Sequence, residues 1–113
     1  MTKYLISFPG AAMDLDESEF EAAGRDSRAV IEEAKAAGVY VFAGGLNESV
    51  GTVRVTADST VVPGGYPDYT DFNGGYTILE LPTHEDAVLW AQKIAAACRC
   101  DQELREFMYD PAS

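Results

Sequence analysis

The chain opens with alternating apolar and polar positions, which is the pattern of a half-buried β-strand. Tyr4, Ile6 and Phe8 share one side of this first strand, which we predict over residues 2–8. Further strand patterns, rich in β-branched and aromatic residues and bounded by Gly, Pro or Asp, follow later in the chain. These patterns predict strands over residues 39–43, 52–56, 60–62, 76–81 and 103–109.

Two segments instead repeat apolar residues at helical spacing. The first carries an apolar stripe from Phe20 to Ala34, and Ser18 with Glu21 forms a capping-box pair that predicts its start. Its stop signal is the pair Ala37-Gly38, in which glycine can adopt a left-handed conformation. The second helix follows Pro82, begins after the predicted cap Thr83 with Asp86 completing the box, and extends to Cys98.

The order of elements is therefore β-α-β-β-(β)-β-α-β within a single domain that covers residues 1–113. This order predicts an α+β, ferredoxin-like split βαβ fold, with an antiparallel sheet and both helices on one face. Nothing is left in a one-domain chain to cover the other face of the sheet. We therefore expect a homodimer that forms through that sheet face.

The segment 63–75 has no periodicity and is crowded with Gly, Pro, Asp and Tyr, as loops with a function often are. Tyr66, Asp68 and Asp71 place phenol and carboxylate groups there, which could form a lid over a small ligand with amide or hydroxyl groups. Tyr4 and Tyr76, on strands, could line the same cleft. The alternative is a solvated connecting loop that contacts the dimer partner, with both strand tyrosines in the core or the interface.

The composition excludes several classes of function. A net charge of -11 argues against binding to nucleic acid or to anionic membrane surfaces. No signal peptide and no apolar run long enough to cross a membrane are expected. Cys98 and Cys100 are too close for an unstrained disulfide and supply too few ligands for zinc, so we expect a cytoplasmic protein without metal or cofactor.

His84 is the only histidine, and a histidine–carboxylate pair is the simplest acid–base machinery at neutral pH. It lies just after the predicted helix cap, beside Glu85 and Asp86. A solvated residue in the first turn of a helix is the alternative interpretation. The loop carboxylates of Asp68 and Asp71 could in principle bind a cation. Their spacing, Asp-x-x-Asp, lacks the pattern of a calcium-binding loop, so no metal site is predicted there.

Several segments, in one order along the chain, carry a family resemblance. They are Lys3-Tyr4-Leu5-Ile6, Ala36-Ala37-Gly38-Val39 with Gly44-Gly45-Leu46, Thr52-Val53-Arg54-Val55, Gly74-Gly75-Tyr76, Asp86 to Ala91, and Glu103-Leu104-Arg105. In motif and order they resemble the YCII-related, DGPF-type family. The resemblance implies a dimeric α/β barrel, with a cleft between sheet, helices and loop, and one branch of the family is held to be enzymatic through a His–Asp pair.

The chain departs from that family at its namesake motif. The resemblance places the stretch DGPFAETKE at residues 63–71, where Pro63 replaces the Asp and Tyr66 replaces the Phe. Asp68 and Asp71 keep the acidic character of the two Glu positions. The aspartate that would serve as the acid–base group is therefore replaced in this chain.

Three hypotheses follow. The first is a small-molecule-binding homodimer with a cleft near the 63–75 loop. The second is a small enzyme of isomerase, hydrolase or cofactor-poor oxygenase type, in which His84, Asp68, Asp71 and Tyr66 handle protons. The third is an interaction module whose acidic surface docks on a basic partner protein.

Overall fold

The computed structural model of the chain describes residues 1–68 and 72–113. The elements, in chain order, are β1 (Thr2–Phe8), η1 (Gly10–Ala12), α1 (Glu17–Ala36), β2 (Tyr40–Gly45), β3 (Val53–Val55), β4 (Val61–Pro63), β5 (Gly75–Leu81), α2 (His84–Cys98) and β6 (Glu103–Glu106). The predicted strands are thus all present. The first has the predicted bounds, the others have shifted ends, and the last one ends at Glu106 rather than at Tyr109.

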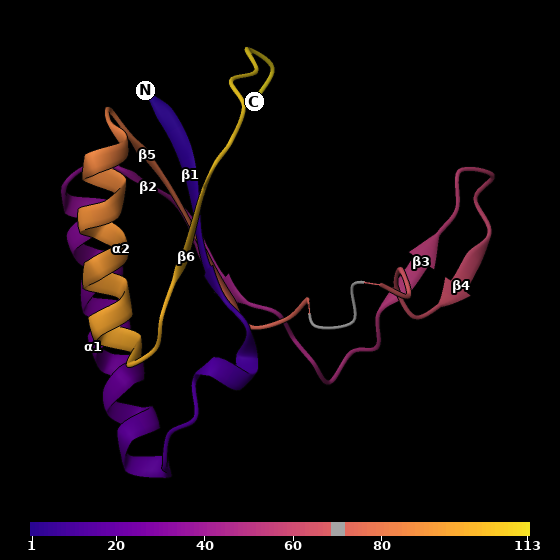
Figure 1. The fold of residues 1–113 in the computed structure, drawn as a ribbon, viewed down its shortest axis with the longest axis horizontal. Coiled ribbons are helices and arrows are strands. Elements are labelled where there is room, and N and C mark those ends of the chain that lie inside the picture. The colour runs from indigo at the N-terminus through magenta and orange to yellow at the C-terminus, as the bar shows by residue number, and fades with distance from the viewer. Residues whose placement is uncertain (69–71) are drawn as a thin grey trace.

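The main sheet has four antiparallel strands in the order β2-β5-β1-β6. β1 and β2 are connected by α1 but separated in the sheet by β5, which is the split βαβ arrangement. Both helices lie on one face of this sheet, as Figure 1 shows. The predicted α+β class is confirmed, and the strand order is compatible with a ferredoxin-like fold.

The core lies between the helices and the sheet, and alternation along the strands decides which side chains enter it. Tyr4 and Ile6 from β1 and Leu79 and Leu81 from β5 are each at most 2% exposed. Burial of a large apolar side chain contributes roughly 1.5–3 kcal/mol. The helices cover these residues mostly with small side chains, which are Ala34 from α1 and Ala87, Ile94 and Cys98 from α2.

The start of α1 differs from the prediction. Its N-cap is Asp16, whose Oδ1 accepts hydrogen bonds from the backbone N–H of Glu19 (2.8 Å) and the hydroxyl of Ser18 (3.0 Å). The predicted capping box of Ser18 and Glu21 is therefore wrong, because the Asp16 carboxylate engages the Ser18 hydroxyl. The bonds from Glu19 and Ser18 hold the pKa of Asp16 below its usual value.

The other predicted helix signals are confirmed. At the start of α2, Thr83 Oγ1 accepts a hydrogen bond from the backbone N–H of Asp86 at 3.1 Å. After α1, Gly38 has a φ of 74°, which is the left-handed conformation expected of a glycine that ends a helix. Neither helix of the described residues has the length and apolar character needed to cross a membrane.

Residues 46–68 form a projection that we call the arm. Within it β3 and β4 pair only with each other, as a separate two-stranded sheet. In Figure 1 the arm extends away from the helices, on the side toward which the uncovered face of the main sheet looks. The radius of gyration is 15.7 Å, where a compact chain of this length has about 13 Å. The arm therefore packs little against its own domain.

The uncovered face of the main sheet, here called the open face, combines apolar and charged side chains. Cross-strand partners share a face, so the pairing of the strands defines its members. Two ion pairs lie on it, Lys3–Glu80 at 3.3 Å between β1 and β5 and Arg105–Glu103 at 3.2 Å within β6. The remaining members are Leu5, Ser7, Phe42, Tyr76 and Ile78.

Candidate functional site

Two of the predicted site residues meet at the end of the sheet where β1 begins. Tyr4 is buried against the helices, and its ring lies 6.2 Å from the ring of His84 in an edge-on contact. His84 is the first residue of α2 and is exposed. Burial and the nearby carboxylate of Glu106 raise the pKa of the Tyr4 phenol, so it stays protonated at neutral pH.

The other predicted site residues lie elsewhere. Tyr66 and Asp68 are exposed on the arm, where the Arg54 guanidinium lies 5.9 Å from the centre of the Tyr66 ring. Tyr76 is on the open face, stacked on Phe72 at 5.4 Å, and its hydroxyl donates a hydrogen bond to the Asn73 carbonyl. Asp71 lies outside the described residues.

A single chain therefore does not gather the predicted residues into one site. Tyr4 and Tyr76 are on opposite faces of the sheet, and Asp68 is on the arm. Within residues 1–68 and 72–113, His84 forms no ion pair with a carboxylate, and no three His, Cys, Asp or Glu side chains are grouped as metal ligands would be. The functional roles of these residues stay predictions.

A cavity of about 590 Å³ lies between α1 and the end of the sheet from which the arm leaves. We call it the cleft. Its volume falls in the range of roughly 300–1,000 Å³ that is typical of small-molecule sites. Its walls come from α1, from the ends of β1, β2 and α2, and from the start of β5. The side chains that define it are Phe8, Met13, Phe20, Arg28, Ile31 and Cys98.

Glycine residues leave this cleft open. Gly24 lies in the middle of α1, where it disfavours the helix by about 0.5–1 kcal/mol relative to alanine. A Cβ placed there would meet only the Arg28 guanidinium, at 3.8 Å. The predicted apolar stripe of α1 begins at Phe20, which is not in the core but 58% exposed at the cleft. The space below Gly24 is therefore not filled by the helix.

At the sheet side of the cleft, glycine lets an aromatic ring lie flat against the backbone. A Cβ on Gly75 would come within 2.6 Å of the Phe8 ring, which is closer than atoms can approach. Gly74 has a φ of 92° and sits where the chain returns from the loop into β5. Phe8 can form part of the cleft wall only because its neighbour in β5 has no side chain.

The cleft carries little charge of its own. Arg28 is the charged side chain among the described residues that line it. Cys98 at its inner end is buried, and burial raises the pKa of the thiol to about 11, so the sulfur is neutral near pH 7. A neutral thiol is a poor nucleophile, which argues against covalent chemistry at this position.

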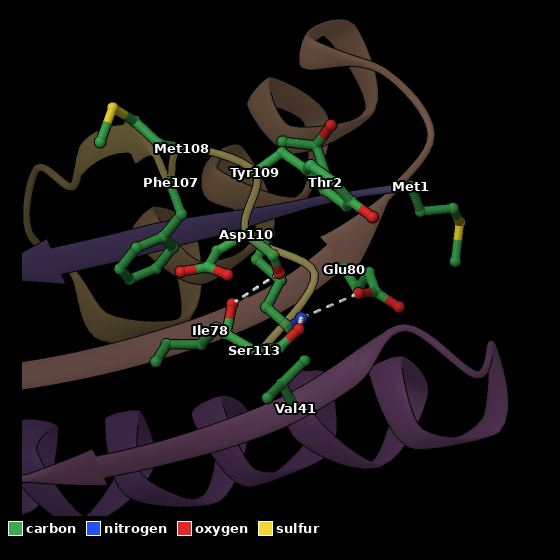
Figure 2. A pocket seen from close by; sticks show the side chains of 11 residues that line it. Met1, Thr2, Val41, Ile78, Glu80, Phe107, Met108, Tyr109, Asp110 and Ser113 are labelled. Carbon is green, nitrogen blue, oxygen red and sulfur yellow. Dashed lines mark hydrogen bonds and ion pairs between the residues drawn. The ribbon is translucent and has the colours of Figure 1, made fainter.

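Two smaller hollows lie on the open face. One, of about 320 Å³, is bounded by the segment after β6, and Figure 2 shows Phe107, Ile78 and Val41 around it. In this hollow Lys3 donates a hydrogen bond to the backbone oxygen of Ser113 at 3.1 Å. The other, of about 270 Å³, lies beside Tyr76. A second molecule packed on the open face would cover both hollows, whereas the cleft lies on the helix side of the sheet.

Sequence analysis missed the residues that shape the cleft. Arg28 falls outside the apolar stripe of α1 and resembles any solvated arginine on a helix. Gly24 was a usable signal, because a glycine inside a well-formed helix needs a packing or functional reason. Its spacing of four residues from Arg28 places both on one face of α1.

The fold and the cleft define a class of protein. It is a small α+β domain with a four-stranded antiparallel sheet and a cavity on the helix side. No family model matches the sequence, and a search of curated proteins found no significant match. The resemblance to the YCII-related family therefore stays a prediction.

Proposed function

We propose that this protein is a cytoplasmic, small-molecule-binding homodimer of the YCII-related type, with its ligand site in the cleft. The observation that carries the proposal is the cleft itself, a cavity of about 590 Å³ with mostly apolar walls. Its wall includes the residues 74–77, so it adjoins the 63–75 loop at which the sequence predicts a site. No comparable observation favours an enzyme, since His84 and Asp68 are exposed and far apart in the fold.

The open face supports association with a second copy. Phe42 on this face is 55% exposed, and Leu5 and Ile78 beside it have no helix above them. The face is also electrically balanced, because Lys3 and Arg105 are paired with Glu80 and Glu103. Two copies of a chain with net charge -11 can therefore meet here without repulsion between unpaired charges. A basic partner protein would find no excess of acidic groups on this face.

The arm supports the same conclusion. Val53 and Val55 on β3 and Val61 on β4 share one side of the hairpin and are each about 60% exposed. An isolated two-stranded hairpin is at best marginally stable in water, so this apolar side needs something to pack against. The arm extends on the side of the open face, where a second copy would lie (Figure 1).

Ligand binding can be tested by a thermal-shift screen of metabolites, because a ligand that binds the native state raises the melting temperature. Gly24→Leu places a large side chain in the cleft and should reduce or abolish the shifts. Ala29→Leu makes a similar change on an exposed position of the same helix and should leave them intact. If no compound raises the melting temperature, or if Gly24→Leu leaves every shift unchanged, the cleft is not the site.

The homodimer can be tested by light scattering coupled to size-exclusion chromatography at micromolar concentration. Phe42→Glu places a charge on the open face along its β2 edge and should yield a monomer. Leu89→Glu introduces the same charge on α2 at a residue that is 57% exposed, and should leave the dimer intact. A wild-type chain that elutes as a monomer would refute this part of the proposal.

A further inference from the structure

The cleft has an unusual charge pattern for so acidic a chain. The sequence contains 19 Asp and Glu residues against 8 Lys and Arg. Among the described residues that line the cleft there is no Asp, Glu, Lys or His, and the one charged side chain is that of Arg28. Cys98 adds no negative charge, because its thiol is neutral near pH 7. The cleft is therefore a weakly cationic, apolar cavity in an anionic protein.

Arg28 is free to bind a ligand. None of the ion pairs within residues 1–68 and 72–113 involves Arg28, although five of the other basic residues have carboxylate partners. Its guanidinium lies back along α1 over Gly24, with Nη1 3.8 Å from where a Cβ would stand. Arg28 is exposed, so its guanidinium lies at the open edge of the cleft, and a side chain at position 24 would lie beside it.

The other groups of the cleft offer a ligand mainly apolar contact. Phe8, Met13 and Ile31 present hydrocarbon and thioether surfaces. The hydroxyl of Ser27 already donates a hydrogen bond to the Gly24 carbonyl at 3.1 Å. A ligand held here thus has an apolar body, with its polar group at the α1 side, where Arg28 lies.

We propose that the cleft binds a small organic acid, with its carboxylate on Arg28 and its aliphatic or aromatic body against the apolar wall. A guanidinium matches a carboxylate through two parallel hydrogen bonds, which a neutral or cationic group cannot reproduce. No acidic side chain among the described residues lines the cleft, so none lies beside the bound carboxylate. This inference rests on the proposed function of the cleft as a ligand site.

The test compares three compounds of equal chain length, hexanoate, hexan-1-ol and hexylamine, by calorimetry and thermal shift at pH 7. Hexanoate should bind at least about tenfold more tightly than hexan-1-ol, because a carboxylate forms an ion pair and two hydrogen bonds with a guanidinium, whereas an alcohol offers one neutral acceptor. Hexylamine should bind most weakly. Equal affinities for the acid and the alcohol, or no binding of hexanoate, would overturn the proposal.

Two variants test whether the preference for the acid over the alcohol comes from Arg28. Arg28→Gln should remove the preference for the acid, because it weakens binding of hexanoate more than binding of hexan-1-ol. Arg25→Gln removes the same charge from an exposed position of the same helix that does not line the cleft, and should retain the preference. Retention of the acid preference by Arg28→Gln would refute the assignment.

Amide chemical shifts distinguish failure of this inference from failure of the proposed function. Hexanoate should shift the amide signals of Gly24, Gly44 and Gly75, which surround the cleft, and not that of Phe107 on the open face. If another class of compound shifts those glycine signals and hexanoate does not, the cleft is a ligand site and the acid class is wrong. If no compound from the screen shifts them, the proposed function fails as well.

Discussion

Replacement of Gly74 by alanine tests the junction between the arm and the sheet. Gly74 has a φ of 92°, outside the range that side-chain-bearing residues ordinarily adopt. A Cβ built at this position would lie 1.9 Å from the backbone oxygen of Phe8 and 2.8 Å from the backbone nitrogen of Gly10. Both atoms belong to the backbone at the end of β1, so neither can move aside as a flexible side chain would.

The expected cost has two parts. A positive φ disfavours alanine by about 1–2 kcal/mol, and an overpacked site that forces the backbone to shift costs typically about 1–3 kcal/mol more. Gly74→Ala should therefore lower the free energy of unfolding by about 2–5 kcal/mol. Gly38→Ala is the matched control, because Gly38 also has a positive φ, 74°, and no atom lies within 4 Å of its Cβ position. It should lose only about 1–2 kcal/mol.

The measurement is urea unfolding of both variants and the wild type, followed by the fluorescence of Trp90, the only tryptophan, and by circular dichroism. In a domain of this size 1 kcal/mol corresponds to about 4 °C in melting temperature, so thermal unfolding gives an independent check. A Gly74→Ala variant no less stable than Gly38→Ala would refute the close approach of the loop end to β1.

Three further predictions follow from single contacts. Gly24→Ala should raise the free energy of unfolding in urea by about 0.5–1 kcal/mol, since its Cβ would make only an ordinary contact with the Arg28 guanidinium, and a loss of stability would contradict this. Asp16 has a lowered pKa in the folded state, so its contribution to stability is full above the usual value of 3.8 and is lost as pH falls through the folded pKa. Asp16→Ala should therefore make the free energy of unfolding less dependent on pH in this acid range. Iodoacetamide at pH 8 should alkylate Cys98, whose pKa is raised to about 11 by burial, more slowly than the half-buried Cys100, and equal rates by mass spectrometry would contradict its burial.

The sequence predicted the elements whose signals are local. The alternation along β1 predicted that Tyr4 and Ile6 share one face of the strand, and both are buried on that face. Thr83 was predicted as the cap of α2 because its acceptor and the Asp86 amide are three residues apart, a spacing that needs no tertiary contact. The cap of α1 was misplaced because Asp16, Ser18 and neighbouring acids all compete for the same amides, and sequence spacing alone does not rank them.

The candidate site was harder to predict, because it depends on contacts between distant segments. Tyr66 and Asp68 were predicted to lie in a loop over the same cleft as the strand residue Tyr76, but the first two lie on the arm. Tyr76 itself is directed to the open face by the register of β5 against β1. The cleft arises where α1 crosses the end of the sheet, and no local pattern in the sequence specifies that crossing.

The same glycines explain why the cleft and the arm occur at one end of the sheet. Gly75 allows the Phe8 ring to lie on β5, and with a side chain there the ring would be displaced from its place in the cleft wall. The carbonyl of Gly74, one residue earlier, accepts a hydrogen bond from the Leu46 amide at 2.8 Å, which joins the first residue of the arm to the residue before β5. Positions 74 and 75 have no side chains, so the space beside β1 is not filled. The arm can therefore be attached at this end of the sheet while a cavity remains next to its attachment point. The cleft is thus a consequence of how the arm is attached, and it opens on the helix side, away from the face on which we place the second copy.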